Sequence, residues 1–225
     1  MKNICFATIF LLAIAVLTNA QPADSKSILR HGNALVAQEK YKLAIDEYSK
    51  VSTRDRDTYA RAIYNIGVCY FELWQTDDAI AFFKRAVELK QGNYPKASYA
   101  LGVALEDQGK ITEARMSYEQ AASASRGELA RATFRIGVLE AKAGEFEKAA
   151  ILFREAAARA GEHVPASHNN LGVMLANLGF MKEAEQEFIF ALKASDGRFD
   201  EATHNLNLCR SLTAGIKREY KLSIL

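Results

Sequence analysis

The chain has 225 residues, of which 49% are hydrophobic and 25% charged, a composition typical of folded domains and not of disordered segments. Its 29 lysines and arginines nearly balance its 27 aspartates and glutamates, which argues against a nucleic-acid partner, because nucleic-acid-binding domains carry a clear basic excess. With only three prolines and no Gly/Ser-rich linker, the sequence predicts one continuous array without a second globular domain.

The first twenty residues have the layout of a secretory signal peptide. Lys2 precedes an apolar run over residues 4–17, and Thr18, Asn19 and Ala20 then supply small or polar side chains. This run is shorter than the roughly 20 apolar residues that span a bilayer. We therefore expect cleavage after Ala20, no stable membrane insertion of the mature chain, and export to the periplasm or the medium. The alternative is an uncleaved N-terminal membrane anchor.

From residue 25 onward the sequence repeats with a period of 35 residues. An alanine, an aromatic residue and a small residue follow each periodic glycine at fixed distances. A fixed period of this length indicates a solenoid of stacked units. The four columns are Gly32, Gly67, Gly102, Gly137 and Gly172; Ala44, Ala79, Ala114, Ala149 and Ala184; Tyr48, Phe83, Tyr118, Phe153 and Phe188; and Val51, Ala86, Ala121, Ala156 and Ala191.

Each unit predicts two helices joined by a turn. In the second unit Ile63, Ile66 and Tyr70 have the spacing of one helical face, and Ala79 and Phe83 begin a second such face. A helix pair this short cannot bury its apolar face alone, so the units must stack. The residue that ends a first helix often has a left-handed backbone conformation, which glycine adopts readily. Glycines stand at this position in three units, at Gly109, Gly144 and Gly179.

The glycine, alanine and aromatic columns resemble the tetratricopeptide repeat, whose usual length is 34 residues. The resemblance implies an all-α solenoid of antiparallel helix pairs wound into a right-handed superhelix. It departs from the family pattern in its fourth column, which becomes polar from the third unit on, at Ser98, Thr133, His168 and Thr203. The predicted array covers 21–213, with repeats at about 25–59, 60–94, 95–129, 130–164 and 165–199, a terminal helix at 200–213 and an unassigned tail at 214–225.

The first helix of each unit has a second face, opposite its packed face, that is not uniformly polar. In tetratricopeptide arrays this face lines the concave groove, so the resemblance implies a binding surface for an extended peptide or a partner protein. Aromatic rings over a valine floor are typical of an interaction site, the basic residues favour a somewhat acidic ligand, and the amides suit a peptide backbone. The amides also resemble the asparagine ladder of the O-GlcNAc transferase repeats. The predicted groove residues are Arg61, Tyr64, Asn65, Val68, Lys96, Tyr99, Arg131, Phe134, Arg135, Asn169, Asn170 and Asn205.

Other interpretations of the same residues stay open. The valine, aromatic and asparagine columns could pack against neighbouring helices, and the basic column could be an ordinary solvated face. A self-associating structural protein and an accessory subunit of an enzyme are the alternative functions. Arg210, which stands at an apolar column in the last helix, favours a capped monomer over end-to-end stacking.

Neither metal nor catalytic chemistry is predicted. Cys69 and Cys209 share a column four repeats apart, which at about 10 Å per helix layer exceeds the reach of a disulfide several times over. His163, His168 and His204 lack further ligands at a spacing that zinc would need. The sequence also has no nucleophile elbow, phosphate-binding loop or HExxH motif. We therefore predict a non-enzymatic protein without cofactors.

Overall fold

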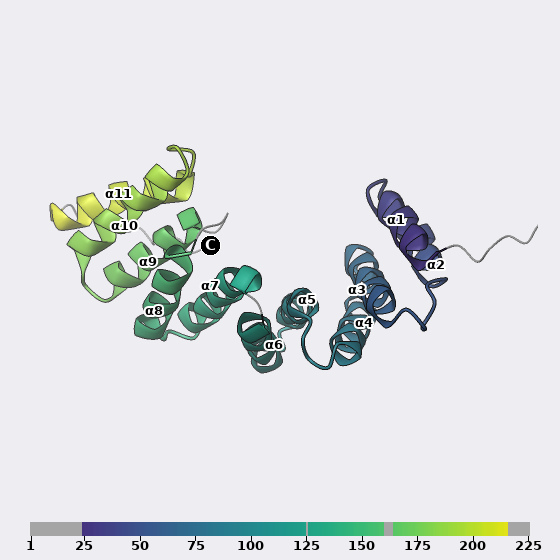
Figure 1. Cartoon of the computed structure of the whole chain (residues 1–225). Coiled ribbons are helices and arrows are strands. Elements are labelled where there is room, and N and C mark those ends of the chain that lie inside the picture. Colours follow the sequence, from purple (N-terminus) through teal and green to yellow (C-terminus); the bar gives the residue numbers. More distant parts are fainter. Residues whose placement is uncertain (1–23, 125, 160–163, 216–225) are drawn as a thin grey trace, which may run out of the picture.

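The computed structural model describes residues 24–124, 126–159 and 164–215, and over these ranges it is made of helices without strands. The helices follow one another along a curved array, with the first helix of each pair on its inner side and the second on its outer side (Figure 1). The prediction of an all-α solenoid with a 35-residue period is confirmed. The signal peptide expected at residues 1–20 lies outside the described residues, as does the tail beyond Gly215. The helices are α1 (Ser25–Val36), α2 (Tyr41–Tyr48), α3 (Arg56–Glu72), α4 (Thr76–Leu89), α5 (Pro95–Asp107), α6 (Ile111–Ala124), α7 (Arg126–Lys142), α8 (Phe146–Ala157), α9 (Val164–Asn177), α10 (Met181–Ala194) and α11 (Asp200–Thr213).

Within each helix pair, the glycine of the first helix packs against the aromatic ring of the second helix. A Cβ atom placed on Gly102 in α5 would lie 2.6 Å from the ring of Tyr118 in α6, far inside van der Waals contact. A Cβ atom on Gly67 would lie 2.7 Å from the ring of Phe83 in the same way. These rings are almost wholly buried, so they cannot swing into solvent to make room. The glycine is therefore needed because the ring of its own repeat occupies the space beside it.

Helix starts follow local capping as well as the repeat period. Helices α3 and α7 begin at Arg56 and Arg126, about one turn before the predicted repeat boundaries. At α3 the carboxylate of Asp55 accepts a hydrogen bond of 3.1 Å from the backbone N–H of Thr58, which satisfies a donor of the first turn. Helix α5, in contrast, begins at Pro95, whose fixed φ suits the first helical position.

The turns inside the helix pairs share one backbone geometry. Gly109, Gly144 and Gly179 have φ values of 73°, 82° and 88°, which confirms the left-handed residue predicted there. Glu39 and Trp74 occupy the same position in the first two repeats and also have positive φ, at 58° and 59°. The turn is thus kept even where a side chain makes it less favourable.

Two of the polar residues of the fourth column, Ser98 and His168, bind the second helix of their own repeat. Ser98 Oγ donates a hydrogen bond of 3.3 Å to Gln120 Oε1, and His168 Nδ1 lies 2.6 Å from Glu187 Oε2. Ser98 is wholly buried, so its partner on α6 compensates for the loss of water. These pairs replace the apolar contact that the family pattern would place between the two helices.

Both described cysteines are structural. Cys69 and Cys209 are buried and neither takes part in a disulfide. Burial raises the pKa of Cys69 to about 11, so this side chain stays a thiol near neutral pH. An inert, packed role follows for it.

Candidate binding groove

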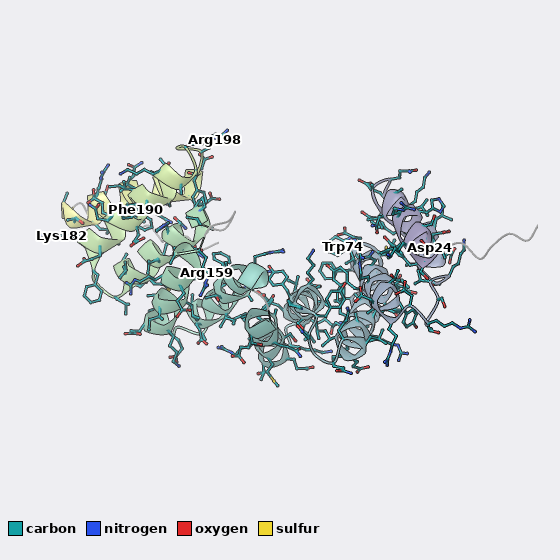
Figure 2. The ribbon with its side chains drawn as sticks, in the orientation of Figure 1. Asp24, Trp74, Arg159, Lys182, Phe190 and Arg198 are labelled. Carbon is teal, nitrogen blue, oxygen red and sulfur yellow. The ribbon has the colours of Figure 1, made fainter. Side chains whose placement is uncertain are left out.

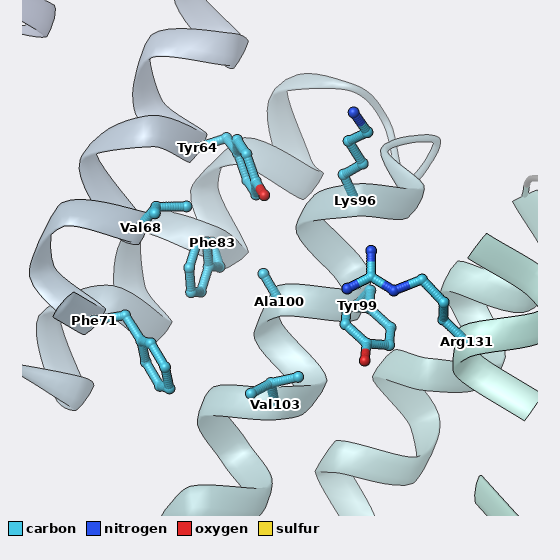
Figure 3. Close-up of a pocket in the computed structure, with 9 residues that line it drawn as sticks. All are labelled: Tyr64, Val68, Phe71, Phe83, Lys96, Tyr99, Ala100, Val103 and Arg131. Atoms are coloured by element: carbon cyan, nitrogen blue, oxygen red, sulfur yellow. The ribbon is translucent and has the colours of Figure 1, made fainter. Parts of the chain in front are cut away.

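A pocket opens on the inner face of the array between α3 and α5, at the predicted groove. Its volume is about 290 Å³, and Arg131 reaches it from α7. Figure 3 shows Tyr64 and Val68 on one side, Lys96 and Tyr99 on the other, and the side chain of Arg131 crossing over Tyr99. Five predicted groove residues therefore line one concave site. The full lining is Tyr64, Val68, Phe71, Phe83, Lys96, Tyr99, Ala100, Val103 and Arg131.

Two tyrosines form the aromatic part of this pocket, and each rests on the buried ring of its own repeat. The ring centroids of Tyr64 and Phe83 are 5.8 Å apart, and those of Tyr99 and Tyr118 are 5.5 Å apart, both in tilted arrangements. Tyr64 and Tyr99 stay partly exposed. Because one side of each ring is packed against the core, the other side is offered to a ligand in a fixed orientation.

Phe134 continues the aromatic column but not the open surface. Its ring centroid lies 5.6 Å from that of Phe153, as in the two preceding repeats, yet only 7% of the residue is exposed. The expectation of a three-ring exposed stripe is therefore wrong at this position, because Phe134 is packed into the core of the fourth repeat.

The basic residues of the groove divide into two kinds. The guanidinium carbon of Arg131 lies 4.4 Å from the ring centroid of Tyr99, a cation–π geometry that holds the charge over the pocket. Arg61 and Lys96 are exposed, so they can pair with an acidic ligand. Lys96 and Arg131, which line the pocket, give it a positive rim.

Arg135, by contrast, is paired inside the protein. Its Nε lies 3.8 Å from a carboxylate oxygen of Glu106, and Glu106 also accepts from Lys142 at 3.2 Å and from the hydroxyl of Tyr118 at 2.9 Å. Burial works to lower the pKa of Arg135, but the neighbouring Tyr118 and Glu106 outweigh it and raise that pKa. The charge of Arg135 is thus balanced by Glu106, and it contributes little to attracting a ligand.

The asparagines bind one another across repeats. Asn65 Nδ2 donates to Asn33 Oδ1 at 3.0 Å, and the same oxygen accepts from the hydroxyl of Tyr48 at 2.7 Å. Further along the array, Asn205 Nδ2 donates to Asn169 Oδ1 at 3.0 Å. These bonds join the first helices of neighbouring repeats along the inner face.

Asn169, Asn170 and Asn205 are also completely buried, each with 0% exposure. Asn169 Nδ2 donates to Asn170 Oδ1 at 3.2 Å, so the three amides form one chain from α11 to α9. The expectation that they lie on an open surface is therefore wrong for this structure. On the inner face, Tyr64 and Tyr99 are thus partly exposed, whereas Phe134 and the three asparagines are buried.

Several pocket residues were not among those predicted from the sequence. Phe83 was assigned only to the packed column, although its ring also forms the floor of the pocket. Val103 belongs to the same column as Val68, so the period already carried its signal. Phe71 stands where later repeats have Glu106 and Ala141, and no periodic pattern pointed to it.

The described ranges hold no cluster of three or more histidine, cysteine, aspartate or glutamate side chains that could hold a metal ion. Among the helices of the described ranges, none has both the length and the apolar character needed to cross a bilayer.

Comparisons with known proteins identify the repeat. The sequence profile described as tetratricopeptide repeat matches residues 29–97, 99–163 and 134–199, which is most of the chain. A comparison with curated protein sequences gave no significant match.

Solved structures share the fold at low identity. MamA from Desulfovibrio magneticus is 18% identical with a TM-score of 0.61, and the match covers 77% of this chain and 96% of that one. YrrB, described as a tetratricopeptide protein with an unusual peptide-binding site, is 19% identical with a TM-score of 0.61, covering 85% and 92%. The C-terminal part of a repeat protein from Cytophaga hutchinsonii is 16% identical with a TM-score of 0.67, covering 85% and 73%. The repeat columns, the helix pairs and the matching profile together show that the chain belongs to the tetratricopeptide repeat family.

Proposed function

We propose that the chain is a monomeric, non-enzymatic scaffold that binds an extended segment of a partner protein at the pocket between α3 and α5. The observation that carries the proposal is the pocket itself: a concave, largely apolar site with two oriented tyrosine rings and a positive rim. Pockets of this kind, apolar with a few placed polar groups, are the usual form of a binding site. The peptide-binding site named for YrrB supports the same class of function for this fold.

The geometry favours a particular ligand chemistry. Stacked repeats about 10 Å apart match about three residues of extended peptide at roughly 3.3 Å each. One large apolar side chain would fill the pocket between Tyr64 and Tyr99, and a carboxylate a few residues away would reach Arg61 or Lys96. The preferred ligand is therefore an extended, somewhat acidic segment with an apolar anchor.

Filling the pocket should abolish this binding without unfolding the protein. Peptides of twelve residues would be selected from a random display library on the purified chain, and their affinities measured by fluorescence anisotropy. Ala100→Phe places a ring where the anchor would sit, and we expect it to weaken binding by at least about tenfold, as loss of a buried anchor does. Lys96→Glu should weaken the binding of acidic peptides, and less so at high salt.

The matched control is Lys182→Glu, which makes the same charge change on α10, on the outer side of the array (Figure 2). Thermal unfolding of all three variants would show that the fold is kept. Selected peptides that bind Ala100→Phe as tightly as the unsubstituted chain would refute the proposed site.

The end of the array supports a monomer. Arg210 on α11 is exposed, and its Nε lies 2.7 Å from Glu185 Oε1 on α10. A charged pair at this end gives the last helix a face that tolerates water, as the terminal unit of a solenoid requires.

We also propose that the chain works outside the cytoplasm, in an envelope or secretion assembly. The support is the signal-peptide layout of residues 1–20. Cell fractionation followed by N-terminal sequencing should find the exported chain beginning at Gln21. A control with Leu11→Arg and Leu12→Arg, which interrupts the apolar run, should stay in the cytoplasm at full length. Recovery of the unsubstituted chain uncleaved from the cytoplasm would contradict export.

A further inference from the structure

One position of the repeat joins first helices of neighbouring repeats along the inner face. It recurs every 35 residues, and in α3, α7 and α11 its polar side chain reaches the first helix of the preceding repeat. Such cross-links help to fix the spacing of the repeats on the groove side. The three contacts are Asn65 Nδ2 to Asn33 Oδ1 at 3.0 Å, Arg135 Nε to Glu106 Oε2 at 3.8 Å, and Asn205 Nδ2 to Asn169 Oδ1 at 3.0 Å.

In α5 this position is Ala100, whose methyl group cannot form a hydrogen bond or an ion pair. On α3, the residues that correspond to the three partners are Tyr64, Val68 and Phe71, which are apolar or aromatic. All four residues line the pocket, and Figure 3 shows Ala100 facing the other three from α5. The pocket is therefore the space that a bridging side chain occupies at other junctions of the array.

The outer side of the same junction is also hollow. A cavity of about 710 Å³ lies between α4 and α6, and Leu101 and Leu105 of α5 form part of its lining. Helix α5 thus has open volume on both its inner and its outer side, where close packing would otherwise hold it in place. Gln108 Nε2 donates to Asp77 Oδ1 at 2.7 Å, which ties the two repeats at the edge formed by the turns. This arrangement allows α5 to tilt about that edge.

We propose that the junction between α3 and α5 is a hinge of the array, and that a large apolar side chain of a bound partner segment fills the space beside Ala100 and fixes the hinge angle. The role of this anchor rests on the proposed function, whereas the hinge itself does not. Because each repeat of a solenoid contacts only its neighbours, rotation at one junction reorients every repeat beyond it. Partner binding at the pocket thereby sets the curvature of the array.

Double electron–electron resonance between two spin labels measures this motion. Labels at Ala81 on α4 and Ile151 on α8 span the hinge, and control labels at Met116 on α6 and Gln186 on α10 occupy the same repeat position without spanning it. All four residues are exposed. Both pairs are two repeats apart, so both mean distances should be about 20 Å. In the whole chain with its three cysteines replaced by alanine, we expect the first distance distribution to be at least about twice as wide as the second.

Two changes should narrow the first distribution to the width of the second. One is a peptide selected on the purified chain, whose anchor supplies the missing contact. The other needs no ligand: Phe71→Glu with Ala100→Arg copies the pair of Glu106 and Arg135 into the hinge. This double variant should also weaken peptide binding by at least about tenfold, because the arginine fills the pocket. Phe71→Glu alone adds no bridge, so its distribution should stay wide.

The outcomes separate the hinge from the proposed function. Equal widths of the two distributions in the unliganded chain would overturn the hinge, even if peptides bind. Peptides that bind in the pocket and leave the first distribution wide would overturn the role of the anchor. If no peptide binds, the proposed function fails and the role of the anchor fails with it. The unliganded distributions and the chain with Phe71→Glu and Ala100→Arg then still decide whether the hinge exists.

Discussion

Replacing Phe153 with alanine should lower the free energy of unfolding by about 3–5 kcal/mol, the usual cost of removing a buried phenylalanine ring. Phe153 has 0% exposure and lies in the middle of the array. Its ring contacts the position beside Gly137 in α7 and supports the ring of Phe134, 5.6 Å away. Loss of the ring therefore leaves a cavity between α7 and α8 that both helices border.

The pairing of ring and glycine makes this prediction more specific. A Cβ atom on Gly137 would lie 2.9 Å from the ring of Phe153, so Gly137→Val should overpack the site and cost about 1–3 kcal/mol. With Phe153→Ala in the same chain, the valine enters the cavity. The double variant should therefore be more stable than the sum of the two single effects implies.

Urea unfolding followed by circular dichroism at 222 nm measures these four stabilities. Ile151→Ala is the matched control, because Ile151 lies on the same helix but is 55% exposed, and its loss should cost about 0.5 kcal/mol or less. Strictly additive effects of Gly137→Val and Phe153→Ala would mean that the glycine and ring columns do not pack as a unit.

The protein should lose stability steeply as the pH rises above about 10. Tyr118 has 0% exposure and Tyr48 has 2%. Burial raises the pKa of Tyr48 to about 12 and raises that of Tyr118 further, with the carboxylate of Glu106 adding to the rise at Tyr118. A raised pKa means that the folded state favours the neutral phenol. The contribution is fully present below the unfolded value near 10 and is lost as the pH rises toward about 12 and beyond.

Urea midpoints measured between pH 8 and pH 12 check this expectation. A chain with Tyr48→Phe and Tyr118→Phe should show a clearly flatter fall above pH 10, although its stability at pH 8 is lower because two hydroxyl hydrogen bonds are gone. Tyr59→Phe removes a hydroxyl from a partly exposed residue and should keep the original slope. The same slope in the double variant and the unsubstituted chain would show that the buried tyrosines are not the cause.

The fold was predictable because each repeat meets the same neighbours. Gly102 and Tyr118 are visible in the sequence only as columns, yet their contact recurs in every helix pair. Helix starts were less predictable, since α3 begins where Asp55 can cap it and not where the repeat begins. A cap depends on one local side chain, which the period does not record.

The candidate site was only partly predictable. The spacing placed Tyr99 and Phe134 in one column on the inner face, and both indeed stack on the ring of their own repeat. Their exposures differ, because Tyr99 borders the open pocket while Phe134 is buried. Likewise, the period assigns the amide of Asn169 to the groove face but does not show that this amide is buried. The period of the repeat tells on which face of its own helix a side chain lies, so the sequence by itself establishes that direction. Whether water or a ligand can reach that side chain depends on how the neighbouring helices pack around it, and that follows from the folded array alone.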